Sequence, residues 1–216
     1  MSKTDYPISK IFDDLYHSTC KETLAGKMRE IEIIQSIPRS AAEYLFNLVC
    51  EHRPTTVIEV GMAWGFSSVA ICAALRDLGE GVNVIMDPYQ LQTWEGVGMM
   101  ALKHCGLEAH AEVHVERSDL FLPNYWKSSA GRASFAFIDG DHRIDAVFVD
   151  FYYVNKILPP GAVVVFDDFQ FHSVASVVQY AMKNFHYERL QCPEARFVVL
   201  KKLRPDERGW SDYGSF

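Results

Sequence analysis

Short apolar runs and helical patterns alternate along this chain, and the alternation predicts an α/β fold. The runs are rich in β-branched or aromatic residues and are bounded by glycine, proline or acidic residues, as buried strands are. We expect strands at 55–58, 82–86, 113–115, 133–138, 162–166, 187–190 and 196–200. Apolar residues between the earlier runs recur every three or four positions, which predicts helices. The last two runs are separated only by a short turn, so they predict an antiparallel hairpin.

This order of elements predicts a doubly wound seven-stranded sheet, mostly parallel with the last strand antiparallel, with helices on both faces. Residues 1–36 carry mixed charge and modest apolar content, so we expect an N-terminal helical extension of one or two short helices. Residues 37–203 form the expected domain, and residues 204–216 form a polar tail.

The stretch 55–68 joins the first strand to a helix through a glycine turn, and the chain is organised around it. Two glycines let a ligand approach the backbone, and the start of a helix offers free N–H groups to a carboxylate or phosphate. A serine is expected to cap this helix. The positions concerned are Glu59, Gly61, Gly65, Ser67 and Ser68. The alternative is an ordinary strand-to-helix turn whose glycines only serve packing.

Polar side chains also follow the next two strands. Asp87 ends the second strand, where doubly wound nucleotide binders hold ribose hydroxyls with a carboxylate. A cap before Pro88 is the alternative. Ser118 and Asp119 follow the third strand.

Three acids follow the fourth and fifth strands, namely Asp139, Asp167 and Asp168. The carboxyl ends of parallel strands share one edge of the sheet, so we expect these acids to converge. Three carboxylates repel one another unless a cation lies between them. Oxygen ligands favour Mg²⁺, Mn²⁺ or Ca²⁺ over zinc, which predicts a divalent metal site. Alternatively, each acid caps the helix that follows it.

His142 lies three residues after Asp139 and is a candidate general base. A neutral imidazole can accept the proton of a hydroxyl whose pKa a metal has lowered. Asp141 is the competing base, or the N-cap of the next helix. A surface histidine at the start of a helix is the bland alternative for His142.

Composition excludes several classes of function. The net charge is -7 and the pI is about 5.6, which argues against a nucleic-acid partner. No apolar stretch is long enough to span a membrane, and no signal peptide is visible. The five cysteines are scattered and form no C-x-x-C pair, which favours reduced thiols and a cytoplasmic location.

These motifs resemble class I S-adenosylmethionine (SAM)-dependent methyltransferases of the metal-dependent O-methyltransferase kind, over roughly residues 38–200. Catechol and caffeoyl-coenzyme A O-methyltransferases share the pattern, and bacterial sugar and natural-product enzymes are closest to it. The fold implied is Rossmann-like. The family segment E-x-G-x-x-x-G-[YF]-S, which holds the methionine end of the cofactor, is matched by Glu59, Gly61, Gly65, Phe66 and Ser67.

The resemblance also assigns roles to the strand-end residues. Asp87 would hold the ribose, and Ser118 and Asp119 would lie along the adenine. The metal ligands would be Asp139, Asp167 and Asp168, with Asp139 also counted among the cofactor-binding residues. His142 stands where the catechol and caffeoyl enzymes have a lysine as general base, so the base is His142 or Asp141.

The expected activity is therefore divalent-metal-assisted, SAM-dependent O-methylation of a small molecule: a phenol, a sugar or another natural product. A metal-independent N- or carboxyl-methyltransferase is the main alternative. An NAD(P)-dependent oxidoreductase or a non-catalytic protein with this fold would also fit. A homodimer is expected only because relatives commonly form one. The expected acceptor-binding segments are 1–36, 88–98 and 169–173, with Tyr6, Tyr89, Trp94, Phe169 and Phe171 as candidate pocket residues.

Overall fold

The structure, a computed structural model, describes residues 7–212, so Tyr6 and the last four residues lie outside it. The α-helices are α1 (Ile8–His17), α2 (Arg39–His52), α3 (Phe66–Leu78), α4 (Val97–His104), α5 (Ser118–Ser129), α6 (Ile144–Ile157) and α7 (His172–Asn184). The strands are β1 (Cys20–Glu22), β2 (Met28–Glu30), β3 (Thr56–Val60), β4 (Val82–Met86), β5 (Ala111–His114), β6 (Phe135–Ile138), β7 (Val163–Phe166), β8 (Tyr187–Arg189) and β9 (Val198–Lys202). Two short 3₁₀ turns are η1 (Ile33–Gln35) and η2 (Glu108–His110).

The fold is the predicted α/β architecture. The large sheet has seven strands in the order β5-β4-β3-β6-β7-β9-β8, and β9 runs antiparallel to both of its neighbours. Strand order reverses direction along the chain after β5, as in doubly wound folds. The chain divides into two compact units: one holds the described residues up to Arg53 together with 62–116, and the other holds 54–61 together with the residues from Arg117 onward. Each unit is described by itself below.

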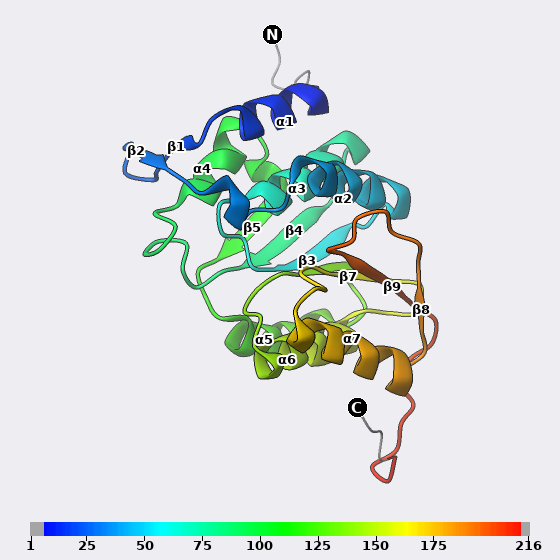
Figure 1. Cartoon of the computed structure of the whole chain (residues 1–216). Helices are drawn as coiled ribbons and strands as arrows, with labels where there is room; N and C mark the ends of the chain where they lie inside the picture. The colour runs from blue at the N-terminus through cyan, green and yellow to red at the C-terminus, as the bar shows by residue number, and fades with distance from the viewer. Residues whose placement is uncertain (1–6, 213–216) are drawn as a thin grey trace. The chain divides into compact units, whose positions relative to one another are not determined.

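The second unit is built on β3, β6 and β7, which pair in parallel, with β9 and β8 added at the edge. All residues of β6 and β7 are buried, which explains their continuous apolar sequences. Helices α5, α6 and α7 lie side by side along one face of this sheet (Figure 1). Lys202, at the end of β9, donates from Nζ to the carbonyls of Asn155 (2.5 Å) and Leu158 (2.8 Å), where α6 ends. Burial lowers the pKa of Lys202 to about 8.

The first unit packs α2 against α3 and pairs β4 with β5 in parallel. The N-terminal segment forms α1, as predicted, but the rest of it is a two-stranded hairpin, β1–β2, that the sequence did not predict. These strands have three residues each and are only partly buried, so they carry no apolar alternation. Arg29 ties the hairpin to a distant loop, because its Nη1 donates to the carbonyl of Thr93 (2.7 Å) and to Glu95 Oε1 (2.8 Å).

The sequence pattern does not show the length of α5, which runs through Pro123 for 12 residues because it packs along α6. One other local prediction was wrong. The cap of α3 was expected at Ser67 or Ser68, but it is Gly65, whose φ of 86° lies in the left-handed region. Both serines lie inside the helix and are buried.

Candidate functional site

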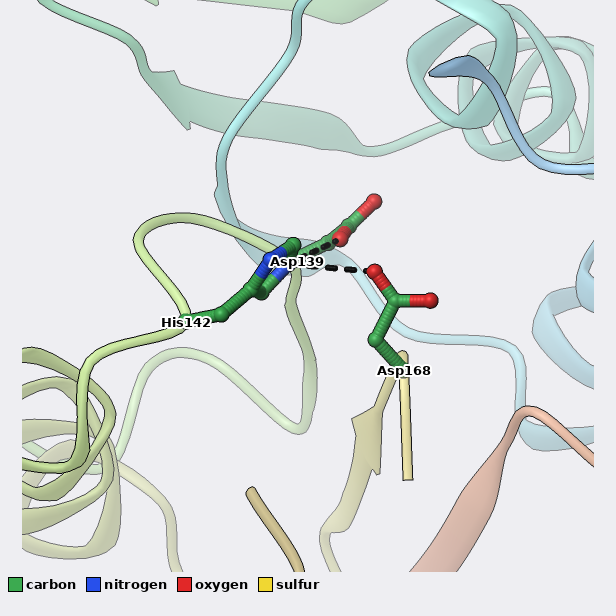
Figure 2. Close-up of side chains that lie close together, drawn as sticks. All are labelled: Asp139, His142 and Asp168. Atoms are coloured by element: carbon green, nitrogen blue, oxygen red, sulfur yellow. Dashed lines mark ion pairs between the residues drawn. The ribbon is translucent and has the colours of Figure 1, made fainter. Parts of the chain in front are cut away.

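An acid–histidine cluster lies at the carboxyl ends of β6 and β7 (Figure 2). The two strands pair in parallel with Ile138 opposite Phe166, so the residues that follow them are neighbours. The Nε2 atom of His142 lies 3.1 Å from Asp168 Oδ2 and 3.5 Å from Asp139 Oδ1. One ligand atom from each of these three residues lies within 4.8 Å of the others. The cluster therefore has the donor set of a small metal site.

Asp167 reaches the same edge of the sheet, but a guanidinium group holds it. Arg196 Nε donates to Asp167 Oδ1 (2.5 Å) and its Nη2 donates to Asp167 Oδ2 (2.7 Å). The Asp167 side chain is completely buried, so this pair is the main partner of its charge. Nη2 also lies 2.9 Å from Asp168 Oδ1. Of the three predicted metal ligands, only Asp139 and Asp168 belong to the cluster with His142.

The sequence analysis did not single out Arg196. Its residue type is common, and its position became meaningful only through the antiparallel pairing of β9 with β7. That register places Val198 opposite Phe166, and the Arg196 carbonyl accepts a hydrogen bond from the amide of Phe169 (2.9 Å). The predicted hairpin was the one signal that could have placed this residue beside the acids.

His142 lies in the loop just before α6, not in the helix itself. The hydroxyl of Ser173, on α7, donates to its backbone carbonyl, and its ring lies 5.0 Å from the ring of Phe171. These contacts fix the loop and the imidazole. The His142 side chain is 40% exposed, but its Nε2 atom, which faces the acids, is shielded from solvent.

The charged groups of the cluster shift one another's pKa values. Burial raises the pKa of Asp139 well above its usual range, and the nearby Asp167 carboxylate adds to this effect. The Asp139 carboxylate raises the pKa of His142. Burial raises the pKa of Asp167, while Arg196 opposes that shift. The site therefore concentrates negative charge that a cation would neutralise.

Asp141, the other candidate base, is not part of the cluster of Asp139, His142 and Asp168. Its carboxylate is exposed and pairs with Arg143, whose Nε lies 2.9 Å and whose Nη2 lies 2.6 Å from Oδ2. This pairing lowers the pKa of Asp141, which makes it a weaker base.

Glu59 and Gly61 lie at the end of β3, in the second unit. Glu59 is fully buried within the strand. Gly61 has φ 89°, and a Cβ atom there would lie 2.0 Å from the carbonyl oxygen of Asp139. No side chain fits at position 61, which explains the first glycine of the turn.

The remaining residues of the turn belong to the first unit. Gly65 begins α3, and a Cβ atom on it would lie 2.7 Å from Gly98 Cα. Phe66 and Ser67 follow in the first turn of α3, and both are buried. The start of α3 thus presents backbone N–H groups next to the close contact between Gly65 and Gly98.

Asp87 clamps the backbone of this turn. Its Oδ2 accepts from the amides of Met62 (3.1 Å) and Ala63 (2.8 Å), and its Oδ1 accepts from the amide of Tyr89 (2.8 Å). Gln90 is fully buried, and its Nε2 donates to Asp87 Oδ2 and to the Ala63 carbonyl. Ala63 needs this support because its φ is 47°. Sequence analysis missed Gln90, since the direction of a polar side chain after a strand is not visible in a pattern.

Replacing Asp87 with asparagine is expected to loosen the turn. The amide group would meet backbone donors where the carboxylate now accepts, leaving buried N–H groups unpaired at a cost of about 1–3 kcal/mol each. We expect a lower free energy of unfolding and weaker binding of S-adenosylhomocysteine (SAH), measured by urea titration and calorimetry. Asp77→Asn, which changes an exposed acid in the same unit, is the control. Equal stability and SAH affinity for Asp87→Asn and wild-type protein would contradict the clamp.

Ser118 and Asp119 are the first residues of α5. Arg117 holds the Asp119 carboxylate through Nε (2.9 Å) and Nη2 (2.8 Å). Ser118 hydrogen-bonds to Asp150 of α6, an almost fully buried acid whose pKa burial raises to about 7. Asp150 therefore links the start of α5 to α6, a contact that the sequence did not reveal.

Replacing Asp150 with asparagine is expected to stabilise the protein, with an effect that grows as the pH rises. The unfolded carboxyl releases its proton near pH 3.8 and the folded one near pH 7, so stability is lost as the pH rises between these values. Asparagine avoids this loss, and we expect a gain of about 1–3 kcal/mol at pH 8 but little at pH 4. Urea titrations at both pH values measure it, with the exposed Asp145→Asn on α6 as control. A difference that is the same at both pH values would contradict the account.

The candidate acceptor residues lie in both units. Within the second unit, Phe171 packs on His142, and Phe169 lies under the guanidinium of Arg189. Within the first unit, Trp94 packs edge-on against Trp64, and Tyr89 is exposed. Along residues 7–212, no helix combines the length and apolar character that a membrane span requires.

Comparison with known proteins identifies the family. A family model described as a methyltransferase domain matches residues 58–169, which is more than half of the chain. No curated protein sequence matches the chain.

Solved structures share the fold. The O-methyltransferase TomG from Streptomyces achromogenes, involved in tomaymycin synthesis and solved with SAM, has a TM-score of 0.65 at 19% identity, covering 78% of this chain and 82% of TomG. An O-methyltransferase from Bacillus cereus in complex with SAH has a TM-score of 0.62 at 16% identity, covering 78% and 83%. The SAH-bound Podospora anserina methyltransferase PaMTH1 has a TM-score of 0.64 at 13% identity, covering 79% and 81%. The chain thus belongs to the methyltransferase-domain family and has the Rossmann-like class I methyltransferase fold.

Proposed function

We propose that this protein is a SAM-dependent O-methyltransferase that methylates a hydroxyl group of a small molecule. The observation that carries the proposal is the cluster of Asp139, His142 and Asp168 at the carboxyl edge of the sheet. An acid–histidine cluster suits the activation of a hydroxyl group, whereas nicotinamide chemistry does not need one. The family match supports methyl transfer, and two of the structurally similar proteins are O-methyltransferases solved with SAM or SAH.

The cofactor would supply an electrophilic methyl group. Residues of this chain proposed to bind it are Glu59, Gly61, Gly65, Phe66, Ser67, Asp87, Ser118, Asp119 and Asp139. Support comes from the backbone they shape: the N-terminus of α3 offers N–H groups that suit a carboxylate, and Gly61 and Gly65 exclude side chains from the turn. In Asp87, Oδ2 accepts three hydrogen bonds from the turn and from Gln90. Its Oδ1 accepts one, from Tyr89, so one acceptor position of Oδ1 stays open to a ribose hydroxyl.

A divalent cation fits the cluster on the chemistry of its donors. Asp139 and Asp168 each offer a carboxylate oxygen within reach of the other, and His142 is the ion-pair partner of Asp139 among the described residues. A bound cation would lower the pKa of an acceptor hydroxyl. The chain's own contribution is to hold the acceptor oxygen near Asp139 and Asp168 and to fix both carboxylates through neighbouring residues.

The structure favours His142 over Asp141 as the functional neighbour of these acids. His142 points at both carboxylates, whereas Asp141 is paired with Arg143. The acceptor class that we propose is a phenol, a sugar or a related natural product, since the candidate acceptor segments supply exposed aromatic side chains such as Tyr89 and Phe171.

The test is product analysis with SAM that carries ¹³C in its methyl group. The protein is incubated with catechols, other phenols and sugars, and in parallel with amines and carboxylic acids, with and without divalent metal. We expect the ¹³C spectrum of the products to show O-methyl ethers only. Products confined to N-methyl groups or methyl esters would overturn O-methylation and leave methyl transfer standing.

A further inference from the structure

We propose that His142 is a ligand of the divalent cation, together with Asp139 and Asp168, and that the preferred ion is a transition metal such as Mn²⁺, Fe²⁺ or Zn²⁺ instead of Mg²⁺. The inference deepens the proposed function and rests on it. The motif alone predicts Asp167 as the third ligand. We assign that place to an imidazole nitrogen of His142 instead.

The first step is that both carboxylate oxygens of Asp167 are already engaged in hydrogen bonds. Arg196 takes both carboxylate oxygens, and the amide of Asp168 donates to Oδ1 as well (2.6 Å). The Asp167 side chain is completely buried and the Arg196 side chain is only 24% exposed. Turning Asp167 toward a cation would break this two-point pair and leave the partly buried guanidinium with Asp168 alone, which disfavours Asp167 as a ligand.

The second step is that Asp168 divides its two oxygens between two neighbours. Its Oδ1 accepts from Arg196 Nη2 (2.9 Å) and from Gln170 Nε2 (2.6 Å), while Oδ2 faces His142. Arg196 thus holds Asp167 in place and orients Asp168 so that its Oδ2 faces the cluster. Outer groups that orient ligands in this way are typical of metal sites.

The third step concerns the imidazole. The Nε2 atom of His142 is shielded from solvent and lies at ion-pair distance from two carboxylate oxygens, 3.1 Å from Asp168 and 3.5 Å from Asp139, but it makes no well-aligned hydrogen bond with any described residue. Ligand atoms about 2.0–2.2 Å from one ion lie roughly 3–3.5 Å apart when they occupy neighbouring positions around it. The observed spacings match this. Ser173 holds the His142 loop through its backbone carbonyl, and Phe171 packs beside the ring, which points toward both acids (Figure 2).

The donor set then decides the ion. Carboxylates and water suit Mg²⁺, whereas imidazole suits Zn, Fe and related transition ions, and Mn²⁺ accepts both. One imidazole and two carboxylates therefore favour a transition ion. A histidine that binds a cation through Nε2 cannot use the same atom to accept a proton, which separates this proposal from a role as general base.

The experiment measures binding of Mn²⁺ to the full-length protein by electron paramagnetic resonance. Pulsed measurements on the bound ion report whether a histidine nitrogen is coordinated. The samples are wild type, His142→Gln, Asp167→Asn and His172→Gln, the last removing an exposed histidine at the start of α7. SAH affinity is measured calorimetrically on every sample.

We expect a nitrogen signal in wild type and His172→Gln, and no signal in His142→Gln with Mn²⁺ affinity at least about tenfold weaker. Asp167→Asn should keep the signal, and Mg²⁺ should compete only in large excess. If Asp167→Asn does not fold, the wild-type and His142→Gln signals decide. No Mn²⁺ binding, no nitrogen signal in wild type, or an unchanged His142→Gln would overturn the proposal. Intact SAH binding beside such a result would leave the methyltransferase function standing, whereas loss of SAH binding by wild type would remove that function separately.

Discussion

Alanine at position 61 is expected to weaken SAH binding strongly. Gly61 has φ 89°, where an alanine costs about 1–2 kcal/mol. Its Cβ would also lie 2.0 Å from the carbonyl oxygen and 2.7 Å from the carbonyl carbon of Asp139. Both clashing atoms belong to the backbone just beyond β6, so β3 or the Asp139 loop must shift, at about 1–3 kcal/mol or more. The strain lowers stability, whereas the shift displaces the proposed cofactor-binding turn and implies a loss of up to roughly a hundredfold in SAH affinity, measured by calorimetry.

Gly161→Ala is the matched control for this substitution. Gly161 also has φ 89°, but no atom lies within 4 Å of the Cβ that alanine would add. It therefore carries the backbone strain without the clash, and it should lose stability while keeping SAH affinity. If Gly61→Ala binds SAH within a few-fold of Gly161→Ala, the close approach of Gly61 and Asp139 has no role in the site.

Asparagine at position 168 is expected to reduce methyl transfer by about 10²–10³-fold, the size of effect that loss of one preorganised electrostatic contact produces. The substitution keeps the shape of the side chain and removes its charge from the cluster with His142 and Arg196. Asparagine tolerates the left-handed backbone of this residue, whose φ is 53°, so the fold should survive. Turnover is followed through SAH release, and SAH affinity should stay close to that of wild type.

Asp141→Asn is the control for Asp168→Asn. Asp141 lies two positions from Asp139 but is exposed and paired with Arg143. Its replacement should change turnover by no more than a few-fold. A large loss in Asp141→Asn beside normal turnover in Asp168→Asn would move the chemistry away from the cluster and make Asp141 the base.

The fold was largely predictable because the central strands of its large sheet are buried on both faces. Continuous apolar runs such as Val163–Phe166, each ending in acids or glycine, identify strands without any knowledge of their partners. The hairpin β1–β2 could not be predicted in this way, since its partly exposed strands bury too little to leave a pattern. The length of the helix through Pro123 was not visible in the pattern because packing along α6 outweighs the local cost of proline.

The candidate site was predictable only in part, for a related reason. Strand ends locate Asp139, Asp167 and Asp168 at one edge, but the sequence does not say which way each carboxylate turns. That choice depends on Arg196, which the antiparallel register of β9 brings to the acids, while the position of His142 depends on Ser173 of α7. Gln90 was invisible for the same reason, as its role depends on the direction of one amide. A motif predicts where a residue lies in the fold, but its chemistry also depends on contacts with residues distant in the sequence.

Calorimetric titration of the protein with SAH, then with SAM, and in parallel with NAD⁺, tests the central claim most directly. A methyltransferase of this family should bind both sulfur compounds, with a Kd of about 1–100 μM and a free energy of roughly -8 to -5 kcal/mol, and should not bind NAD⁺. Saturable binding of NAD⁺ with no heat from SAM or SAH would contradict the account, because the glycine turn and the strand-end acids would then serve a nucleotide-binding oxidoreductase.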